Sequence, residues 1–195
     1  MKNWTLILLL LLFIQACKSK EKEPEKDTSS YFHVSNYLKS EVKRLDTSLY
    51  SFIKIETVNG RSDTTDISRE EIRKYAADFL DIPDIRDKKI GKDYEAMVSY
   101  DTLAGRVYMS YTAYDKDVEV VKQDVSIMPG LGAVEDKVMT LYIEKIKDED
   151  DVITEKKMLW DTQRYFNIRT ITQKKNEPEQ VHNLKIQWNG SQWEQ

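Results

Sequence analysis

Residues that could perform catalysis or bind a metal are scarce in this chain of 195 residues. It contains one cysteine, Cys17, and two histidines, His33 and His182. Nucleophilic catalysis needs an activated Ser or Cys beside a base, and no Gly-x-Ser-x-Gly motif occurs. Zinc sites combine three or four His, Cys or acidic ligands, and the two histidines are far apart in the sequence. We therefore predict no catalytic residue, no metal and no cofactor. We favour a non-catalytic protein and keep an enzyme as an alternative.

Three residues remain as candidates for ligand binding: His182, Trp160 and Trp188. His182 alternates with apolar residues, which predicts a partly buried histidine with satisfied hydrogen bonds more readily than a catalytic base. Trp160 and Trp188 belong to a short echo, in which residues 157–165 match residues 185–193 at an offset of 28. Two similar hairpins with both indoles on one sheet face explain the echo better than an aromatic ligand site. His33 precedes the first expected helix and is interpreted as solvated.

Two loops also contain residue types that can bind ions. The acidic run Asp148–Asp151 could attract calcium, but it lacks the spaced ligands and the glycine of a calcium loop. It is interpreted as a charged hairpin tip. The segment Pro129–Ala133 is rich in glycine, but no Lys-Ser or Lys-Thr follows it, so it is not a phosphate loop. It is predicted to be a wide turn between strands, with a contact loop around Leu131 as the alternative.

The N-terminus carries the most informative motif. Residues 1–16 form a short basic start, an apolar run and a small residue before Cys17, which is typical of a secretory signal. The apolar run is short for a membrane span, which needs about 20 apolar residues. The segment 14–17, Ile-Gln-Ala-Cys, resembles a bacterial lipobox. That resemblance implies cleavage before Cys17 and its lipidation, which anchors the chain stably. An ordinary signal peptide with an incidental cysteine is the alternative.

The segment 17–30 after the expected cleavage site contains almost no apolar side chain, which predicts a flexible tether. Its mixed charges resemble the export tethers of surface lipoproteins of Bacteroidetes. Lys18 after Cys17 favours the outer membrane, by resemblance to enterobacterial sorting, and the periplasmic face is preferred over surface exposure. The formal net charge of −4 argues against a nucleic-acid partner. Residues 31–195 are predicted to be a single domain.

The first part of this domain, residues 31–91, is predicted to be helical with one hairpin. A helix is expected to begin near Ser35, and a strand to cover Leu49–Val58. Asn59-Gly60 is a strong hairpin turn signal, followed by a polar return strand over 61–67. Ser68 and Glu71 form a capping box. A continuous amphipathic helix is expected from Ile72 to Leu80.

The second part, residues 92–195, changes to a period of two, which predicts an antiparallel meander. The expected strands cover 93–100, 105–114, 117–127, 137–146, 152–160, 164–173 and 180–188. The fold class is therefore α+β: two helices and a hairpin followed by a curved antiparallel sheet. In outline it resembles cystatin-like and lipocalin-like half-barrels and the lipoprotein-carrier family. None of their motifs is present, so this resemblance implies no functional residues.

These features lead to three functional hypotheses. The first is a lipid-anchored cell-envelope lipoprotein that binds a protein or glycan partner without catalysis. The second is a carrier of a hydrophobic ligand inside the curved sheet, which fails if the helix 72–80 fills that space. The third, less favoured, is a hydrolase of envelope glycans, which requires two acids facing one cleft.

Overall fold

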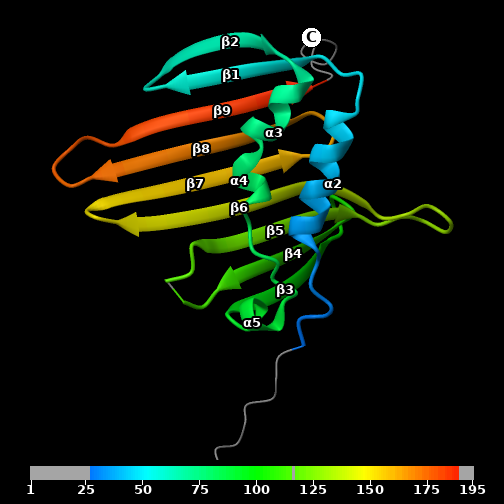
Figure 1. The fold of residues 1–195 in the computed structure, drawn as a ribbon. Helices are drawn as coiled ribbons and strands as arrows, with labels where there is room; N and C mark the ends of the chain where they lie inside the picture. Colours follow the sequence, from blue (N-terminus) through cyan, green and yellow to red (C-terminus); the bar gives the residue numbers. More distant parts are fainter. Residues whose placement is uncertain (1–26, 116, 189–195) are drawn as a thin grey trace, which may run out of the picture.

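The computed structural model describes residues 27–115 and 117–188, and its centre is one sheet of nine antiparallel strands (Figure 1). The fold class is α+β, with a curved meander, as predicted from the sequence. The strands are β1 (Phe52–Val58), β2 (Arg61–Ile67), β3 (Tyr94–Asp101), β4 (Arg106–Ala113), β5 (Val120–Met128), β6 (Lys137–Glu149), β7 (Val152–Asp161), β8 (Tyr165–Lys174) and β9 (Gln180–Trp188).

The strand order is β2-β1-β9-β8-β7-β6-β5-β4-β3. Strands β3 to β9 form a meander, in which each strand pairs with the next along the chain. Strand β1 departs from this pattern, because it pairs with the last strand, β9, as well as with β2. Phe52 therefore lies opposite Trp188. The hairpin β1–β2 therefore extends the sheet and is not part of a separate helical unit. The edges of the sheet are β2, which is polar, and β3.

One face of the sheet is covered by helices, seen in front of the strands in Figure 1. The longest helix is α2 (Val34–Asp46), and the shorter pieces are η2 (Arg69–Glu71), α3 (Ile72–Tyr75), α4 (Ala77–Leu80) and α5 (Lys88–Gly91). Leu38, Val42 and Leu45 are completely buried, because their spacing of four and three places them on one face of α2. They join a single apolar core with side chains of the central strands.

The segment expected as one helix from Ile72 to Leu80 is instead divided into α3 and α4. The break is at Ala76, which has φ −88° and ψ 5° and is fully buried. The capping box at Ser68 and Glu71 is present, with the Glu71 carboxylate accepting from the Ser68 amide at 3.0 Å. The local start signal was thus correct. The continuity of the helix was wrong, because the backbone leaves the helical conformation at Ala76.

The first helix begins at Val34, one residue before the expected start. Its N-cap is His33, whose side chain makes no capping hydrogen bond, and Ser35 is buried in the first turn. The first strand begins at Phe52, later than the expected Leu49. Phe52 faces the core, so Ile53 and Ile55 lie on the opposite, uncovered face of the sheet.

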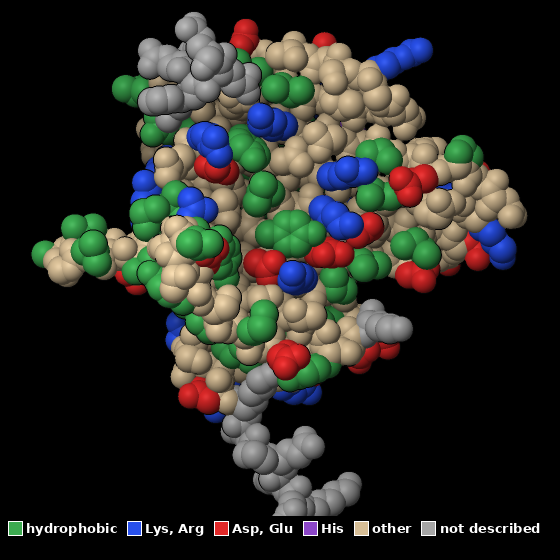
Figure 2. Space-filling model, turned by 180° about the vertical axis from the view of Figure 1, so that it is seen from behind, with side chains coloured by type: hydrophobic (Ala, Val, Ile, Leu, Met, Phe, Trp, Pro, Cys, Tyr) green, Lys and Arg blue, Asp and Glu red, His purple; other side chains and the backbone are tan. Residues whose placement is uncertain are grey.

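The uncovered face of the sheet mixes apolar, basic and acidic side chains without a large area of one kind (Figure 2). Ion pairs between neighbouring side chains occur on this face, such as Lys122 with Asp124 at 3.0 Å and Lys157 with Glu155 at 2.8 Å. Ser110 also donates to Asp124 at 2.6 Å. A polar face of this kind is usual for an antiparallel sheet that is covered on one side only.

The N-terminal part of the described chain is attached to the domain earlier than expected. Thr28, assigned to the tether from sequence, is fully buried, and its hydroxyl donates to the Arg86 carbonyl at 2.8 Å. Its methyl group lies against Gly91. The domain therefore includes residues before Tyr31. The expected signal peptide, Cys17 and most of the tether lie outside the described residues. Among the described residues, no helix has the length and apolar character to cross a membrane.

Candidate binding groove

A groove of about 820 Å³ lies where α2, the α2–β1 connection, the start of β6 and the β7–β8 turn meet. Ligand sites are typically concave and carry a few placed polar groups on an apolar frame. The volume falls within the range of about 300–1,000 Å³ that is usual for small-molecule sites. Nine residues line it: Tyr37, Glu41, Arg44, Tyr50, Lys137, Val138, Thr162, Gln163 and Arg164.

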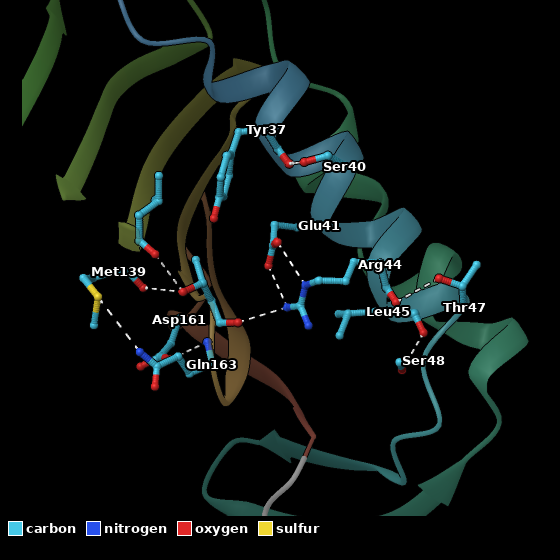
Figure 3. Close-up of polar contacts among 12 residues, drawn as sticks. Tyr37, Ser40, Glu41, Arg44, Leu45, Thr47, Ser48, Met139, Asp161 and Gln163 are labelled. Atoms are coloured by element: carbon cyan, nitrogen blue, oxygen red, sulfur yellow. Dashed lines mark hydrogen bonds and ion pairs between the residues drawn. The ribbon is translucent and has the colours of Figure 1, made fainter. Parts of the chain in front are cut away.

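Helix α2 places three of these side chains. Tyr37, Glu41 and Arg44 are spaced by four and three residues, so they share one flank of the helix. That flank is adjacent to the buried stripe that packs on the sheet. The same amphipathic pattern that fixes α2 on the sheet therefore directs these polar side chains toward the β7–β8 turn (Figure 3).

Arg44 is the residue that connects the helix to the turn. Its Nε and Nη2 donate to the two carboxylate oxygens of Glu41 at 3.0 and 2.8 Å. Nη2 also donates to the Thr162 carbonyl at 3.0 Å, across 118 residues of sequence. The hydrogen bonds to Glu41 raise the pKa of the Arg44 guanidinium. Arg44 is thus a fixed positive charge in the wall of the groove.

The β7–β8 turn is held by Asp161 and Thr162. Asp161 accepts from the Gln163 amide at 3.0 Å and from Arg164 Nη2 at 2.8 Å. The Thr162 hydroxyl donates to the Val138 carbonyl at 2.9 Å, which attaches the turn to β6. Arg164 remains well exposed, and its pKa is raised by the hydrogen bonds to Asp161. The turn therefore presents a second positioned guanidinium.

Two phenols complete the groove. Burial raises the pKa of Tyr37 to about 12, and the negative charge of Glu41 contributes to the shift. The Tyr37 hydroxyl therefore stays protonated near neutral pH and can donate a hydrogen bond. Tyr50 is about one-third exposed, in the α2–β1 connection. Aromatic rings with a polar tip are suited to contacts that combine apolar area with a hydrogen bond.

The lining combines charged, phenolic and amide side chains. The lining residues include no histidine and no cysteine, and the hydroxyl of Thr162 is committed to Val138. Glu41 is bound at both oxygens by Arg44. A nucleophile with an adjacent base is therefore missing from the groove. The lining contains three cationic side chains and the carboxylate of Glu41, and Asp161 beside it pairs with Arg164, which leaves a small positive balance.

The two tryptophans of the sequence echo lie in the core. Trp160 and Trp188 are completely buried on the helix-covered face, with ring centroids 5.8 Å apart. Phe79 of α4 lies edge-on against Trp160, and Phe166 stacks on it. The two indoles do cover the same sheet face, as the repeat indicated. Neither reaches the groove, and a ligand could touch them only if the helices moved away.

The two histidines occupy separate positions. Nε2 of His182 lies 2.8 Å from Oε1 of Glu56, and the ring is less than half exposed. Lys54 donates to the other oxygen of Glu56 at 2.9 Å. The prediction of a partly buried histidine with a satisfied hydrogen bond is confirmed. His33 is the N-cap residue of α2, and its Nδ1 lies 3.3 Å from Oδ2 of Asp84, so the ring is only partly solvated.

The two suspected ion-binding loops are turns between strands. Asp150 and Asp151 form the tip of the β6–β7 hairpin, both with positive φ (48° and 66°). Among the described residues no group of three or more His, Cys, Asp or Glu could hold a metal ion. The segment Pro129–Ala133 forms the loop between β5 and β6, and Leu131 is 85% exposed.

Sequence reasoning did not single out any groove residue. A signal was present, because Tyr37, Glu41 and Arg44 follow helical spacing on a predicted helix. Their partner, the β7–β8 turn, is more than 110 residues away, and no local pattern indicates that contact. Comparisons of the chain with models of protein families, with curated proteins and with solved structures found no match.

Proposed function

We propose that this chain is a lipid-anchored protein of the bacterial cell envelope whose domain binds a partner without catalysis. The observation that carries the binding role is the groove beside α2. Arg44 is paired with Glu41 and Arg164 with Asp161, so the groove offers positioned guanidiniums and phenols but no nucleophile with a base. The lipobox-like segment 14–17 supports the anchor, and Lys18 after Cys17 supports the outer membrane, where we prefer the periplasmic face.

The partner class that fits the groove is an envelope glycan that carries carboxylate groups. Arg44, Arg164 and Lys137 supply positive charge, and arginine side chains pair well with carboxylates. The rings of Tyr37 and Tyr50 add flat apolar area beside these charges. A protein partner is the alternative outcome of the experiment below.

The two other functional hypotheses find less support. A carrier would need free space between the sheet and residues 72–80, but Ile72, Ala76 and Phe79 are completely buried there. A glycan hydrolase would need two acids facing one cleft, but the groove contains a single carboxylate, that of Glu41, which is bound by Arg44.

The groove is tested by sedimentation of the purified chain with peptidoglycan sacculi, whose peptides carry carboxylates. We expect binding to fall about tenfold for Arg164→Ala, because one charge-assisted hydrogen bond is worth about 1.5–3 kcal/mol. Lys175→Ala removes a cation at the opposite end of the sheet and is the matched control. A photo-crosslinking residue at Gln163 then reports the partner in native membranes. Crosslinks to a protein, without sedimentation, would replace the glycan by a protein partner.

The anchor is tested separately by fractionation of cells that express the Cys17→Ala variant. The native chain is expected in the outer-membrane fraction, and the variant is expected to be absent from it. Presence of the variant in the outer-membrane fraction at the native level would contradict lipidation at Cys17 as the basis of localisation.

A further inference from the structure

Exposed apolar side chains gather at one corner of the sheet. Among the described residues, fourteen large hydrophobic side chains are exposed, and eight of them belong to two neighbouring hairpins. These hairpins are β3–β4 and β5–β6. Their turns lie at the same end of the sheet because successive strands alternate in direction. The eight are Met97, Val98, Tyr100, Leu103, Tyr108, Met128, Leu131 and Val134. We call this area the apolar corner.

The tips of the two hairpins are the most exposed parts of the apolar corner. Leu103, in the β3–β4 turn, is 98% exposed, and Leu131 and Val134 are 85% and 69% exposed. The β5–β6 loop projects from the body of the domain, at the right of Figure 1 and the left of Figure 2. Residues 129–134 of this loop carry no charge.

The β5–β6 loop has a fixed shape. The Gly130 amide donates to Asp136 at 2.9 Å, and the Val134 amide donates to the Leu131 carbonyl at 3.2 Å. A Cβ at Gly130 would lie 1.7 Å from the Val134 carbonyl oxygen, so only glycine fits there. The loop therefore presents Leu131 and Val134 on a preorganised turn.

The opposite end of the sheet has a different character. Two of its four hairpin tips are strongly charged: Asp148–Asp151 between β6 and β7, and 174–179 (Lys-Lys-Asn-Glu-Pro-Glu) between β8 and β9. The far edge strand β2 is also polar, with the sequence Arg-Ser-Asp-Thr-Thr-Asp-Ile. The apolar corner thus contrasts with the charged tips of the β6–β7 and β8–β9 hairpins and with the polar edge strand β2.

The N-terminal end of the described chain lies beside the start of β3, at the same edge of the sheet as the apolar corner but at the other end of that strand. Thr28 is bonded to Arg86 and packs on Gly91, just before β3 begins. The Tyr31 ring lies 4.9 Å from that of Tyr111 in β4. Only nine residues separate Cys17 from Asp27, and the ten Cα-to-Cα steps reach at most about 35 Å. An anchor at Cys17 therefore keeps this edge of the sheet, and not the β2 edge, near the lipid.

From these observations, and resting on the proposed lipid anchor, we propose that the apolar corner docks on the lipid bilayer, with Leu103, Leu131 and Val134 inserted among the lipid headgroups. Exposed apolar areas on soluble domains mark protein or membrane contacts. The short tether and the position of Thr28 select the membrane as the occupant.

Edge strand β3 limits the depth of this contact. The Asp93 carbonyl accepts from the Tyr114 amide. The backbone N–H and C=O groups of every second residue from Asp93 onward therefore point toward β4. The backbone groups of Ala96, Val98 and Tyr100 therefore point toward the free edge. Such groups cannot enter hydrocarbon without hydrogen bonds. The loop tips can enter the interface, while the strand stays at the hydrated headgroup level.

The test uses single cysteines, because a lipidated Cys17 leaves the mature chain without another thiol. Leu103→Cys and Leu131→Cys are each labelled with an environment-sensitive fluorophore. The matched controls are Thr64→Cys on β2 and Glu177→Cys in the β8–β9 turn, both exposed. The lipidated chain is reconstituted in vesicles of phosphatidylethanolamine and phosphatidylglycerol. A nitroxide-labelled lipid is expected to quench the probes at 103 and 131 at least threefold more than those at 64 and 177.

Three outcomes are informative. Equal quenching at the four positions, in a chain whose wild-type form does not react with maleimide, overturns the docking and leaves the anchor intact. A wild-type chain that does react shows that Cys17 is not lipidated. The quenching is then measured for Cys17→Ser chains added to the same vesicles, and equal values overturn the docking as well. Disulfide-linked dimers of Val98→Cys, without lipid quenching at Leu103, overturn it in favour of pairing between β3 strands of two copies.

Discussion

Phe79 lies edge-on against Trp160, with ring centroids 5.2 Å apart and an angle of 84° between the rings. Both side chains are completely buried, although one belongs to a four-residue helix and the other to a central strand. The same ring of Phe79 also meets Phe166 at 5.5 Å. This contact holds the short helices on the sheet and fills the space where a carried ligand would have to lie.

Replacing Phe79 by alanine is expected to lower the free energy of unfolding by about 3–5 kcal/mol, because a large buried side chain is lost and a cavity remains. Urea unfolding followed by tryptophan fluorescence measures the change. Tyr100→Ala, which removes a largely exposed aromatic ring, is the control and should change stability by about 0.5 kcal/mol or less. Similar losses in both variants would contradict the view that the helices depend on this contact.

Replacing Gly91 by alanine tests whether the N-terminal segment is part of the domain. A Cβ at this position would lie 2.0 Å from the Ile85 carbonyl oxygen and 2.6 Å from the Thr28 methyl group. We expect a loss of about 1–3 kcal/mol, typical of overpacking, together with faster proteolysis near residue 28. Gly105→Ala is the control. A Cβ at Gly105 would have no atom within 4 Å, but the backbone there has φ +61°, so this variant measures backbone strain alone, about 1 kcal/mol. Intact protection of residue 28 in Gly91→Ala would show that this packing does not hold the segment.

A double-mutant cycle of Glu41 and Arg44 tests the wall of the groove. The pair is bidentate, and Glu41 is nearly buried while Arg44 is 39% exposed. We expect a coupling energy of about 1 kcal/mol, at the low end for charged hydrogen bonds, because solvent reaches the arginine. Thermal and urea unfolding of Glu41→Ala, Arg44→Ala and the double variant give the value. A cycle on Lys174 and Glu177, an exposed pair at 3.9 Å, should give a coupling near zero.

The stability of the protein is expected to depend on pH through Glu56. Its pKa is lowered by hydrogen bonds from Lys54 first and from His182 second. The carboxylate is therefore favoured in the folded state. Its contribution is fully present above the unfolded pKa of about 4.3 and is lost as pH falls through the lower folded pKa. Carbon-detected NMR titration should place the pKa of Glu56 below that value. Glu56→Gln should weaken the loss of stability between about pH 5 and pH 3, whereas Glu95→Gln, on the uncovered face, should not.

Much of the fold could be predicted from local signals. The strand boundaries of the meander agree with the expected ones within three residues, because turn residues interrupt a clear period of two. The hairpin at Asn59-Gly60 has the positive φ values that its residues tolerate, 48° and 82°. The equivalence of Trp160 and Trp188 was also visible, since a repeated spacing repeats a side-chain direction.

The remaining features depend on contacts between distant segments. The pairing of β1 with β9 joins Phe52 to Trp188, and nothing near either residue indicates it. The groove likewise requires Arg44 to meet Thr162 across 118 residues. The break at Ala76 follows from packing against the sheet, which overrides the regular helical pattern of residues 72–80.

The sequence by itself determined the period of each segment, the turns, and the expected anchor at Cys17, because each depends on neighbouring residues. Only the tertiary structure decided which polar side chains share a groove and that the two exposed leucines lie at the same end of the sheet. Leu103 is unremarkable in the sequence, and Leu131 stood out only as the centre of an alternative contact loop. They become neighbouring tips only because antiparallel pairing brings two hairpins to the same end of the sheet. Which side chains come together in this protein thus depends on the order of the strands, and hydrophobic periodicity does not encode that order.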